Sequence, residues 1–384
     1  KGLLWASGAW VWRWKDSIDR KFMARFSALP ATMRPADVEL PHVMHCGGCG
    51  AKLPAGMLRE VLADMALAFP AVVDSSQFND DAAVVDPQPG TVLIQSVDSL
   101  RELIDDPWIM GRVAALHALS DIHAMGARPH SCLAQITLPY ASSQLQRRDL
   151  ALLMHGALTE MERVDCQLIG GHSLEGPELA IGFTVNGELE RDRLLHKTAV
   201  TVGDRLVLTR PLGTGVLFAA LMQGAADGRW IVNAVTSMLM GNAAAAEIAG
   251  QFGVRACTDI TGFGLAGHLL EMLQGQSLQA RLDLSSVPLL PGARELFSRA
   301  YASTLEPGNR EAVVEELENE CTGRDDSLKA LFDPQTSGGL LLAVAPGKVS
   351  SLIKALQEAG CAQATEIGEL LPLPTGAGKL RVHC

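Results

Sequence analysis

A thiol and an ammonium group lie three residues apart in the segment HCGGCGAK, residues 45–52, as Cys49 and Lys52. The glycines beside them leave this backbone free to move. Pro54, followed by apolar residues at helical spacing, predicts that a helix begins directly afterwards. A helix N-terminus and a nearby ammonium both favour the thiolate over the thiol. The pattern therefore predicts a mobile, reactive loop in which Cys49 is the reactive thiol.

Cys46 stands before Cys49 at the C-x-x-C spacing, and His42 and His45 lie close by. Structural zinc normally uses two separated ligand pairs, and the sequence has no second C-x-x-C and no matching pair of histidines. A thioredoxin-like redox pair is expected near a βαβ unit and without a neighbouring loop that bears a lysine. Both interpretations stay open, and so does a part for Cys46 in the chemistry.

Five aspartates are expected at the ends of helices and strands: Asp80 and Asp81 before a strand, Asp98 closing one, Asp121 in the last turn of a helix, and Asp259 after a helix. Taken singly, each fits a cap or a turn. A carboxylate in the last turn faces the negative end of the helix dipole, at a cost of about 0.3–1 kcal/mol, and two adjacent carboxylates repel each other. A shared cation reverses both effects. An oxygen-rich set suits Mg²⁺, which binds through a few carboxylates and substrate phosphates.

Four glycine-rich turns follow strand-like runs, at residues 170–173, 212–215, 261–264 and 337–339. Their backbone N–H groups can form an anion-binding concavity, and each can equally be a tight turn. His172, in the first, is the histidine best placed to contact a ligand. The third continues as G-x-G-x-x-G over 262–267 with a helix after it, which is the pattern of a dinucleotide site. The charge of Asp259 argues against that interpretation, and a Walker A loop is absent.

Strand-like and helix-like segments alternate from about residue 45. The runs AAVVD and TVLIQSV predict a β-hairpin, residues 109–125 predict an Ala-rich helix that stops at Gly126, and residues 180–189 predict a strand. A fresh strand after residue 200 predicts a domain boundary, and four strands are expected beyond it, in DRLVLTR, GVRACTD, QARLDL and GGLLLAVA. We expect an α/β (α+β) chain with one domain over 42–200 and another over 201–384.

The composition excludes some classes of function. The chain has 384 residues, of which 32 are basic and 43 acidic, and no basic run with interleaved aromatic residues indicates a nucleic-acid surface. No apolar stretch approaches the length of an integral membrane span. Of the eight cysteines only Cys46 and Cys49 form a tight pair, and the rest fit scattered thiols in a reducing cytoplasm better than a disulfide framework.

The first thirty residues differ from the rest, because several tryptophans are followed by basic residues. An interfacial membrane helix is one interpretation. The tail of a preceding domain is the other, and we favour it because residues 28–41 then form a Pro-rich linker. We therefore assign residues 1–41 to an upstream tail and its linker.

Seven segments, in the family's order, resemble selenophosphate synthetase (selenide, water dikinase): GCGAK (48–52), DDAAV (80–84), SVDSL (96–100), SDIHAMGARP (120–129), GGHS (170–173), TDITGFGLAGH (258–268) and DPQTSGGLLLAV (333–344). The resemblance covers residue 45 to the C-terminus. It implies an ATP-dependent enzyme that makes selenophosphate from selenide and releases AMP and orthophosphate. It also implies the aminoimidazole-ribonucleotide-synthetase-like fold, with two α/β domains and a homodimer formed through the sheet of the first.

The same resemblance implies roles for individual residues. Cys49 and Lys52 are the catalytic pair, and three aspartates hold Mg²⁺: Asp81, Asp121 and Asp259. The contacts to ATP and its metal fall to Lys52, Phe78, Asn79, Asp80, Asp98, Asp121, Gly171, His172 and Ser173. The G-x-G-x-x-G segment then belongs to a metal-anchoring turn. Some members have a second cysteine where this chain has Ala51, and some have a basic residue in place of Asn79. Residues 1–30 resemble the end of an NADH-dehydrogenase-like flavoprotein domain that is fused upstream in some bacteria.

Two other hypotheses stay open. Another ATP-dependent synthetase or small-molecule kinase of the same superfamily would share the fold but would not require the thiol of Cys49. A non-enzymatic selenium or metal carrier would use Cys46 and Cys49, and it would leave the five aspartates without a role.

Overall fold

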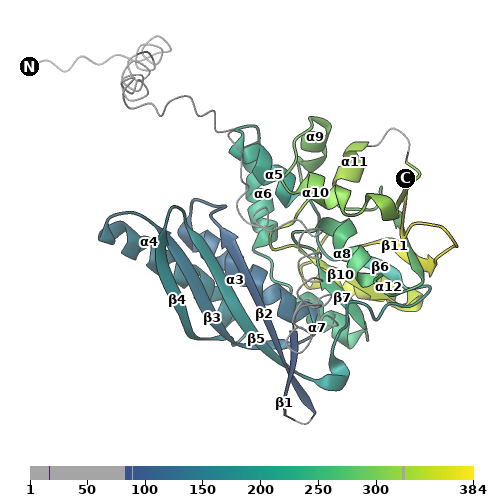
Figure 1. Cartoon of the computed structure of the whole chain (residues 1–384), viewed down its shortest axis with the longest axis horizontal. Coiled ribbons are helices and arrows are strands. Elements are labelled where there is room, and N and C mark those ends of the chain that lie inside the picture. Colours follow the sequence, from purple (N-terminus) through teal and green to yellow (C-terminus); the bar gives the residue numbers. More distant parts are fainter. Residues whose placement is uncertain (1–16, 18–82, 89, 322–324) are drawn as a thin grey trace, which may run out of the picture. The chain divides into compact units, whose positions relative to one another are not determined.

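The computed structural model describes Ser17 and residues 83–88, 90–321 and 325–384. The predicted reactive loop 45–52, the helix expected after it, the residues 78–81 and the predicted tail 1–41 therefore lie outside the described residues, Ser17 apart. From Ala83 onward the described residues belong to one compact unit. Two β-sheets form its framework (Figure 1).

The first sheet has the strand order β1-β2-β5-β3-β4. Its strands are β1 (Ala83–Gln88), β2 (Thr91–Arg101), β3 (Arg128–Pro139), β4 (Gln167–Gly176) and β5 (Ala180–Glu190). The strands β1 and β2 pair antiparallel around a short turn, so the predicted hairpin is confirmed. The strand predicted over 180–189 is also confirmed, because β5 spans it. Only β3 and β4 pair in parallel in this sheet, and the helix α4 (Ser143–Glu162) connects them.

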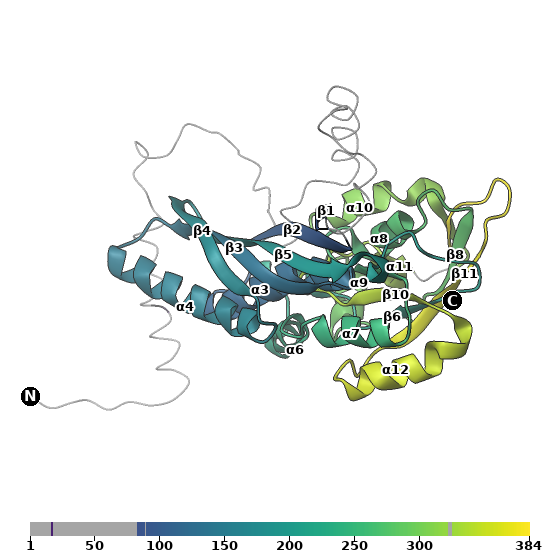
Figure 2. The same ribbon diagram turned by 90° about the horizontal axis from the view of Figure 1, so that it is seen from below.

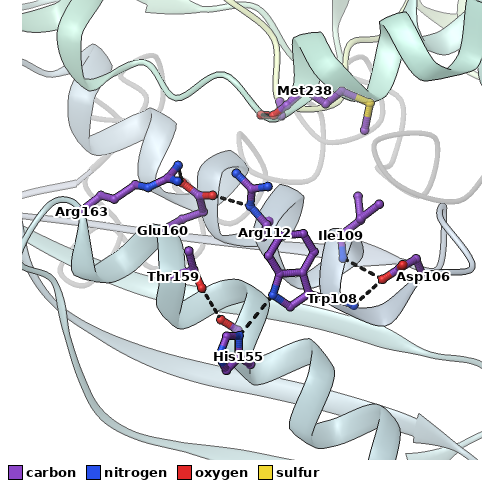
Figure 3. Close-up of polar contacts among 10 residues, drawn as sticks. Asp106, Trp108, Ile109, Arg112, His155, Thr159, Glu160, Arg163 and Met238 are labelled. Atoms are coloured by element: carbon purple, nitrogen blue, oxygen red, sulfur yellow. Dashed lines mark hydrogen bonds and ion pairs between the residues drawn. The ribbon is translucent and has the colours of Figure 1, made fainter.

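Two helices, α3 (Pro107–Ala124) and α4, cover one face of this sheet (Figures 1 and 2). They approach closely because each has a glycine at the crossing. A Cβ atom on Gly111 would lie 1.9 Å from the carbonyl oxygen of Leu153, and one on Gly156 would lie 2.0 Å from that of Trp108. Polar contacts also link the two helices (Figure 3). Trp108 Nε1 donates to His155 Nδ1 over 3.2 Å, and Arg112 pairs with the buried Glu160.

The helix predicted over 109–125 is present but begins two residues earlier. Asp106 is its N-cap, and its side chain accepts hydrogen bonds from the backbone N–H groups of Trp108 and Ile109 (Figure 3). Pro107 occupies the first helical position, where its lack of an N–H costs nothing. The helix ends where expected, because Gly126 follows with a positive φ of 78°. These capping signals lie before the Ala-rich run, which explains the displaced start.

The second sheet has the order β7-β10-β6-β11-β8-β12-β9. Its strands are β6 (Arg205–Leu208), β7 (Ala256–Asp259), β8 (Leu278–Asp283), β9 (Leu317–Asn319), β10 (Leu340–Val344), β11 (Thr365–Pro372) and β12 (Leu380–His383). The four strands predicted in this half are confirmed as β6, β7, β8 and β10. Both faces are buried: Leu206 and Leu208 belong to one apolar cluster, while Val207, between them, belongs to another. This alternation is the period of a strand covered on both sides.

Helices and short 3₁₀ turns connect these strands. They are η4 (Arg191–Arg193), α5 (Thr214–Met222), α6 (Gly228–Met238), α7 (Ala243–Gln251), α8 (Gly264–Met272), α9 (Ala293–Ser298), α10 (Glu306–Glu311), η5 (Val314–Glu316), α11 (Asp325–Lys329), η6 (Pro346–Lys348) and α12 (Val349–Glu358). The helices α5, α6 and α9 contribute to the same apolar cluster as the first sheet and α3. The two halves of the described chain therefore share part of one core.

The structure tests two further predictions, one on the cysteines and one on membrane spans. Cys321 and Cys384 form a disulfide with a Cα–Cα distance of 5.6 Å, so the expectation of scattered thiols is wrong for this pair. The β9–β12 pairing brings the two cysteines together although they lie 63 residues apart, which spacing along the chain does not reveal. Across the described part of the chain, no single helix has the length and apolar character to cross a membrane; α6 and α7 meet that test only as a bent pair.

Candidate active site

Asp98 lies inside β2, not at the end of a strand, so the prediction that it closes a strand is wrong. It stands opposite Phe183 of β5, and β2 continues to Arg101. The apolar run that indicated this strand stops at Val97, whereas the hydrogen-bonded pairing with β5 continues past it. The carboxylate faces α3: its Oδ2 lies 3.5 Å from Nε2 of His117, which is fully buried.

His117 connects Asp98 to a turn of the second half of the chain. Its Nδ1 accepts a hydrogen bond from the backbone N–H of Ser337 over 3.2 Å. Because this nitrogen is an acceptor, the neutral ring carries its proton on Nε2, the atom that faces Asp98. The histidine thus joins a strand of the first sheet to the glycine-rich turn 337–339.

Asp121 lies in the last turn of α3, as predicted. Its Oδ2 accepts a hydrogen bond from Ser96 Oγ of β2. Ser96 and Asp98 are two residues apart on one strand, so their side chains share a face of the sheet, the one that α3 covers. The structure therefore brings Asp98 and Asp121 to the same β2–α3 contact.

Asp259 ends the strand β7, in the other half of the chain, and does not directly follow a helix, contrary to prediction. It contacts α3 through Ser120. Ser120, the neighbour of Asp121 in α3, donates to Asp259 Oδ2 over 2.6 Å. Asp259 is only 1% exposed, and its Oδ1 has no hydrogen-bond partner within the part of the chain that the structure describes. A buried carboxylate oxygen without a donor is costly unless a cation or another donor meets it.

The segment 170–173 is not a turn, contrary to prediction. It lies within the edge strand β4, where Gly171, His172 and Ser173 are all exposed. A Cβ atom on Gly171 would lie 2.2 Å from the carbonyl oxygen of Ala134, so the glycine pair serves close strand contact. Gly171, Ala134, Phe183 and Asp98 follow one another across four strands. At a strand spacing near 4.8 Å, this register separates Gly171 from Asp98 by about 14 Å.

The turn 337–339 precedes β10 and does not follow a strand, again unlike the prediction. Ser337 has a φ of 50°, which is unusual for a residue with a side chain. Its hydroxyl donates to the carbonyl oxygen of Met238 over 2.7 Å. A Cβ atom on Gly338 would lie 1.9 Å from the carbonyl oxygen of Ile260, next to Asp259, so only glycine fits there. Contacts with α3, with α6 and with Ile260, directly after β7, therefore hold this turn in place.

The turn 261–264 leads from β7 into α8 and is held by His268. The Nε2 of His268 accepts from the backbone N–H of Thr261 over 3.1 Å, so its Nδ1 carries the proton and faces Glu271. Although burial raises the pKa of Glu271, the ammonium of Lys197 at 2.9 Å and the contact with His268 hold it at about 2. This buried network fixes the start of the helix that follows Asp259.

Several residues of this junction had no predicted role of their own, namely Ser96, His117, Ser120, Arg210 and Asn242. Ser96 and Ser120 stand inside segments that resemble the family, and His117 lies one helical turn before Asp121, so these three carried a signal. Arg210 and Asn242 carried none, because they contact the site only through the fold.

Among the described residues, no three His, Cys, Asp or Glu side chains come together in a group that could hold a metal ion. Asp81, the third predicted magnesium ligand, lies outside the described residues, as do Cys49, Lys52, Phe78, Asn79 and Asp80. The residues that are described fit a cation in two respects. The donor set is carboxylate oxygen, which suits Mg²⁺, and Asp259 presents a buried oxygen that lacks a donor.

Comparison with known proteins identifies the class of this fold. Residues 79–189 match the family described as AIR synthase related protein, N-terminal domain, and residues 201–380 match the corresponding C-terminal domain. Thiamine-monophosphate kinase from Stenotrophomonas maltophilia shares the fold, with a TM-score of 0.59 and 21% identity over 86% of this chain and 96% of that one.

Within this class, two curated relatives are more similar in sequence. Selenide, water dikinase of Pelobacter propionicus is 35% identical over 89% of this chain and 98% of its own length. The enzyme of the same name from a Shewanella strain is 36% identical over 83% and 90%. The chain belongs to the selenide, water dikinase family.

Proposed function

We propose that this chain converts ATP, selenide and water into selenophosphate, orthophosphate and AMP. Membership of the selenide, water dikinase family supports this reaction. The observation in the structure that carries the proposal is the junction of Asp98, Asp121 and Asp259. Asp98 and Asp121 lie at the contact of β2 with α3, and Asp259 of β7 contacts Ser120, the neighbour of Asp121 in α3. The Oδ1 of Asp259 is buried and has no donor among the described residues.

At this junction we assign Mg²⁺ to Asp121 and Asp259, together with Asp81. The cation supplies positive charge against the polyphosphate of ATP. The chain's own part is to hold the carboxylates in position beforehand, since positioning and charge stabilisation provide most of the catalysis in phosphoryl transfer. We assign contacts to ATP to Phe78, Asn79, Asp80 and Asp98, and to Gly171, His172 and Ser173 on β4.

We assign the chemistry at selenium to the loop 45–52. Cys49 positions the selenium nucleophile, and Lys52 stabilises the charge on the transferring phosphoryl group. The glycines on either side let the loop cover ATP, which excludes water that would otherwise intercept the phosphoryl group. These roles come from the resemblance of the GCGAK motif to the family.

Phosphorus NMR tests this function. ATP, MgCl₂ and selenide incubated with the chain are expected to give selenophosphate and AMP, and Cys49→Ser is expected to give no selenide-dependent AMP. Ser131→Ala serves as the control, because it removes a buried hydroxyl in the first sheet that contacts Asn186. Full selenide-dependent activity in Cys49→Ser would contradict the role of Cys49.

The same spectra separate the two alternative functions. ADP as the sole nucleotide product would favour a kinase of the same superfamily, the class of the solved thiamine-monophosphate kinase. Tight binding of selenium or metal without turnover of ATP would favour a carrier.

We further propose that the chain forms a homodimer through the open face of its first sheet and works in the cytoplasm. Two exposed apolar side chains support the dimer. Val97 and Leu133 lie in one row of this face and are 65% and 40% exposed. The domain limits 42–200 and 201–384, and an NADH-dehydrogenase-like flavoprotein domain fused upstream of residues 1–30, remain proposals of the same kind.

A further inference from the structure

A chain of four polar side chains runs through the interior and ends at Asp259. Arg210 Nη2 donates to Asn242 Oδ1 over 2.9 Å. Asn242 Nδ2 donates to Ser120 Oγ over 2.8 Å, and Ser120 donates to Asp259 Oδ2 over 2.6 Å. All four residues are at most 3% exposed. This hydrogen-bonded series joins four separate segments of the protein, so only the fold assembles it.

The arginine sets the direction of every hydrogen bond in this chain. A guanidinium can only donate, so the oxygen of the Asn242 amide must face Arg210 and its NH₂ group must face Ser120. The hydroxyl of Ser120 then accepts from that NH₂ group, and its single hydrogen is left for Asp259. The carboxylate oxygen at the end of the chain is therefore held as an acceptor.

Backbone carbonyl groups fix the orientations of the Arg210 guanidinium and the Asn242 amide. Arg210 Nη1 donates to the carbonyl oxygens of Ser237 and Met240, at the end of α6, over 2.6 and 2.5 Å. The carbonyl oxygen of Gly338 accepts from both Arg210 and Asn242, the latter over 2.9 Å. A flipped Asn242 amide would place its oxygen against this carbonyl and its NH₂ group against the guanidinium. Both contacts are repulsive.

We propose that Arg210, Asn242 and Ser120 are positioning residues that hold Asp259 Oδ2, so that Oδ1, which has no partner among the described residues, is the oxygen that binds the cation. The inference rests on the proposed function, in which Asp259 is a Mg²⁺ ligand. It adds three residues that contact neither cation nor ATP and act through Asp259. Partners that orient a metal ligand in this way typically change metal affinity by about 10- to 100-fold.

The isosteric substitution Asn242→Asp distinguishes this role from a general electrostatic effect. The new carboxylate still accepts from Arg210, but its second oxygen now accepts the hydrogen of Ser120 and takes it from Asp259. A general effect of the added negative charge would strengthen cation binding. The positioning role requires that binding weaken, so the two explanations differ in sign.

The test is the binding of Mn²⁺, as a probe for Mg²⁺, to the full chain, measured by electron paramagnetic resonance. Ser120→Ala and Asn242→Asp are each expected to weaken binding about 10-fold. The double variant is expected to bind no more weakly than Ser120→Ala alone, because Asn242 acts through Ser120. Thermal unfolding without metal shows that each variant folds, and Ser131→Ala is the matched control.

The outcomes separate this inference from the function on which it rests. Normal Mn²⁺ binding in Ser120→Ala and Asn242→Asp, with binding lost in Asp259→Asn, would overturn the positioning role alone. Normal binding in Asp259→Asn would overturn both the positioning role and the assignment of the cation to Asp259. Formation of selenophosphate in the NMR assay is independent of either result, since it reports the reaction itself.

Discussion

At the residue scale, the neighbours of two buried carboxylates, Asp259 and Asp333, determine which oxygen is free to bind a ligand and how readily the group takes up a proton. Asp259 has one oxygen held by Ser120 and one that has no partner in the described part of the chain. Asp333, in the DPQTSGG segment, is completely buried, and its Oδ2 accepts from the backbone N–H of Gly215 and from Gln335. Burial raises the pKa of Asp333 to about 8, although these hydrogen bonds lower it. Asp333 is therefore protonated in the folded chain at neutral pH.

This raised pKa predicts how the free energy of unfolding changes with pH. The folded chain keeps the proton of Asp333 up to about pH 8, whereas the unfolded chain loses it near pH 4. The contribution to stability is complete below pH 4 and is lost as the pH rises through 8, at about 1.4 kcal/mol per pH unit within this window. Asp333→Asn removes the titrating group and keeps an oxygen for Gly215. Urea unfolding at pH 5 and 8.5 should show wild type losing a few kcal/mol relative to the variant, and parallel pH profiles would contradict the raised pKa.

At the scale of elements, the packing of α3 determines where the residues of the candidate site lie. This helix carries His117, Ser120 and Asp121, and it can approach α4 closely because Gly111 and Gly156 lack side chains. The hydrogen bond of Trp108 and the ion pair of Arg112 with residues of α4 then hold the helix in one position (Figure 3). A shift of α3 would move all three polar side chains relative to Asp98 and Asp259.

A matched pair of glycine substitutions tests this packing. Gly111→Ala places a methyl group 1.9 Å from a carbonyl oxygen of α4, so we expect a loss of about 1–3 kcal/mol in the free energy of unfolding. Gly250→Ala, in α7, meets no atom within 4 Å and has a helical backbone. It should gain up to about 1 kcal/mol, the helix preference of alanine over glycine. Equal effects of the two substitutions in urea unfolding would show that the glycine at the crossing is not needed.

At the scale of the whole molecule, the candidate site lies where α3 contacts β7. The face of the first sheet opposite α3 and α4 is not covered by another described helix (Figure 1). Val97 is exposed to 65% on this face although it is an apolar side chain in the middle of a strand. Exposed apolar side chains on one sheet face favour an interface there. The proposed homodimer would bury them.

Two valines of equal exposure test the dimer. Val97→Glu places a charge in the proposed interface and is expected to give a monomer in sedimentation equilibrium. Val232→Glu, on α6, changes a side chain that is 66% exposed outside this face and should leave the dimer intact. A dimer that persists in Val97→Glu would place the interface elsewhere, and a wild-type monomer would end the proposal.

The sequence alone determined which residue types are present and which elements carry them. Hydrophobic periodicity, Gly126 and the turn between β1 and β2 act over a few residues. For this reason the sequence predicts the hairpin, the long helix and four of the seven described strands of the second sheet, but not β9, β11 or β12. The resemblance of seven segments also identified Asp98, Asp121 and Asp259 as candidate ligands. Only the tertiary structure decided that Asp98 lies inside a strand, that residues 170–173 form an edge strand, and that Arg210 and Asn242 reach Asp259. Strand pairing and buried hydrogen bonds join residues that lie from 32 to 139 positions apart in these cases, and no local pattern of residue types records such contacts.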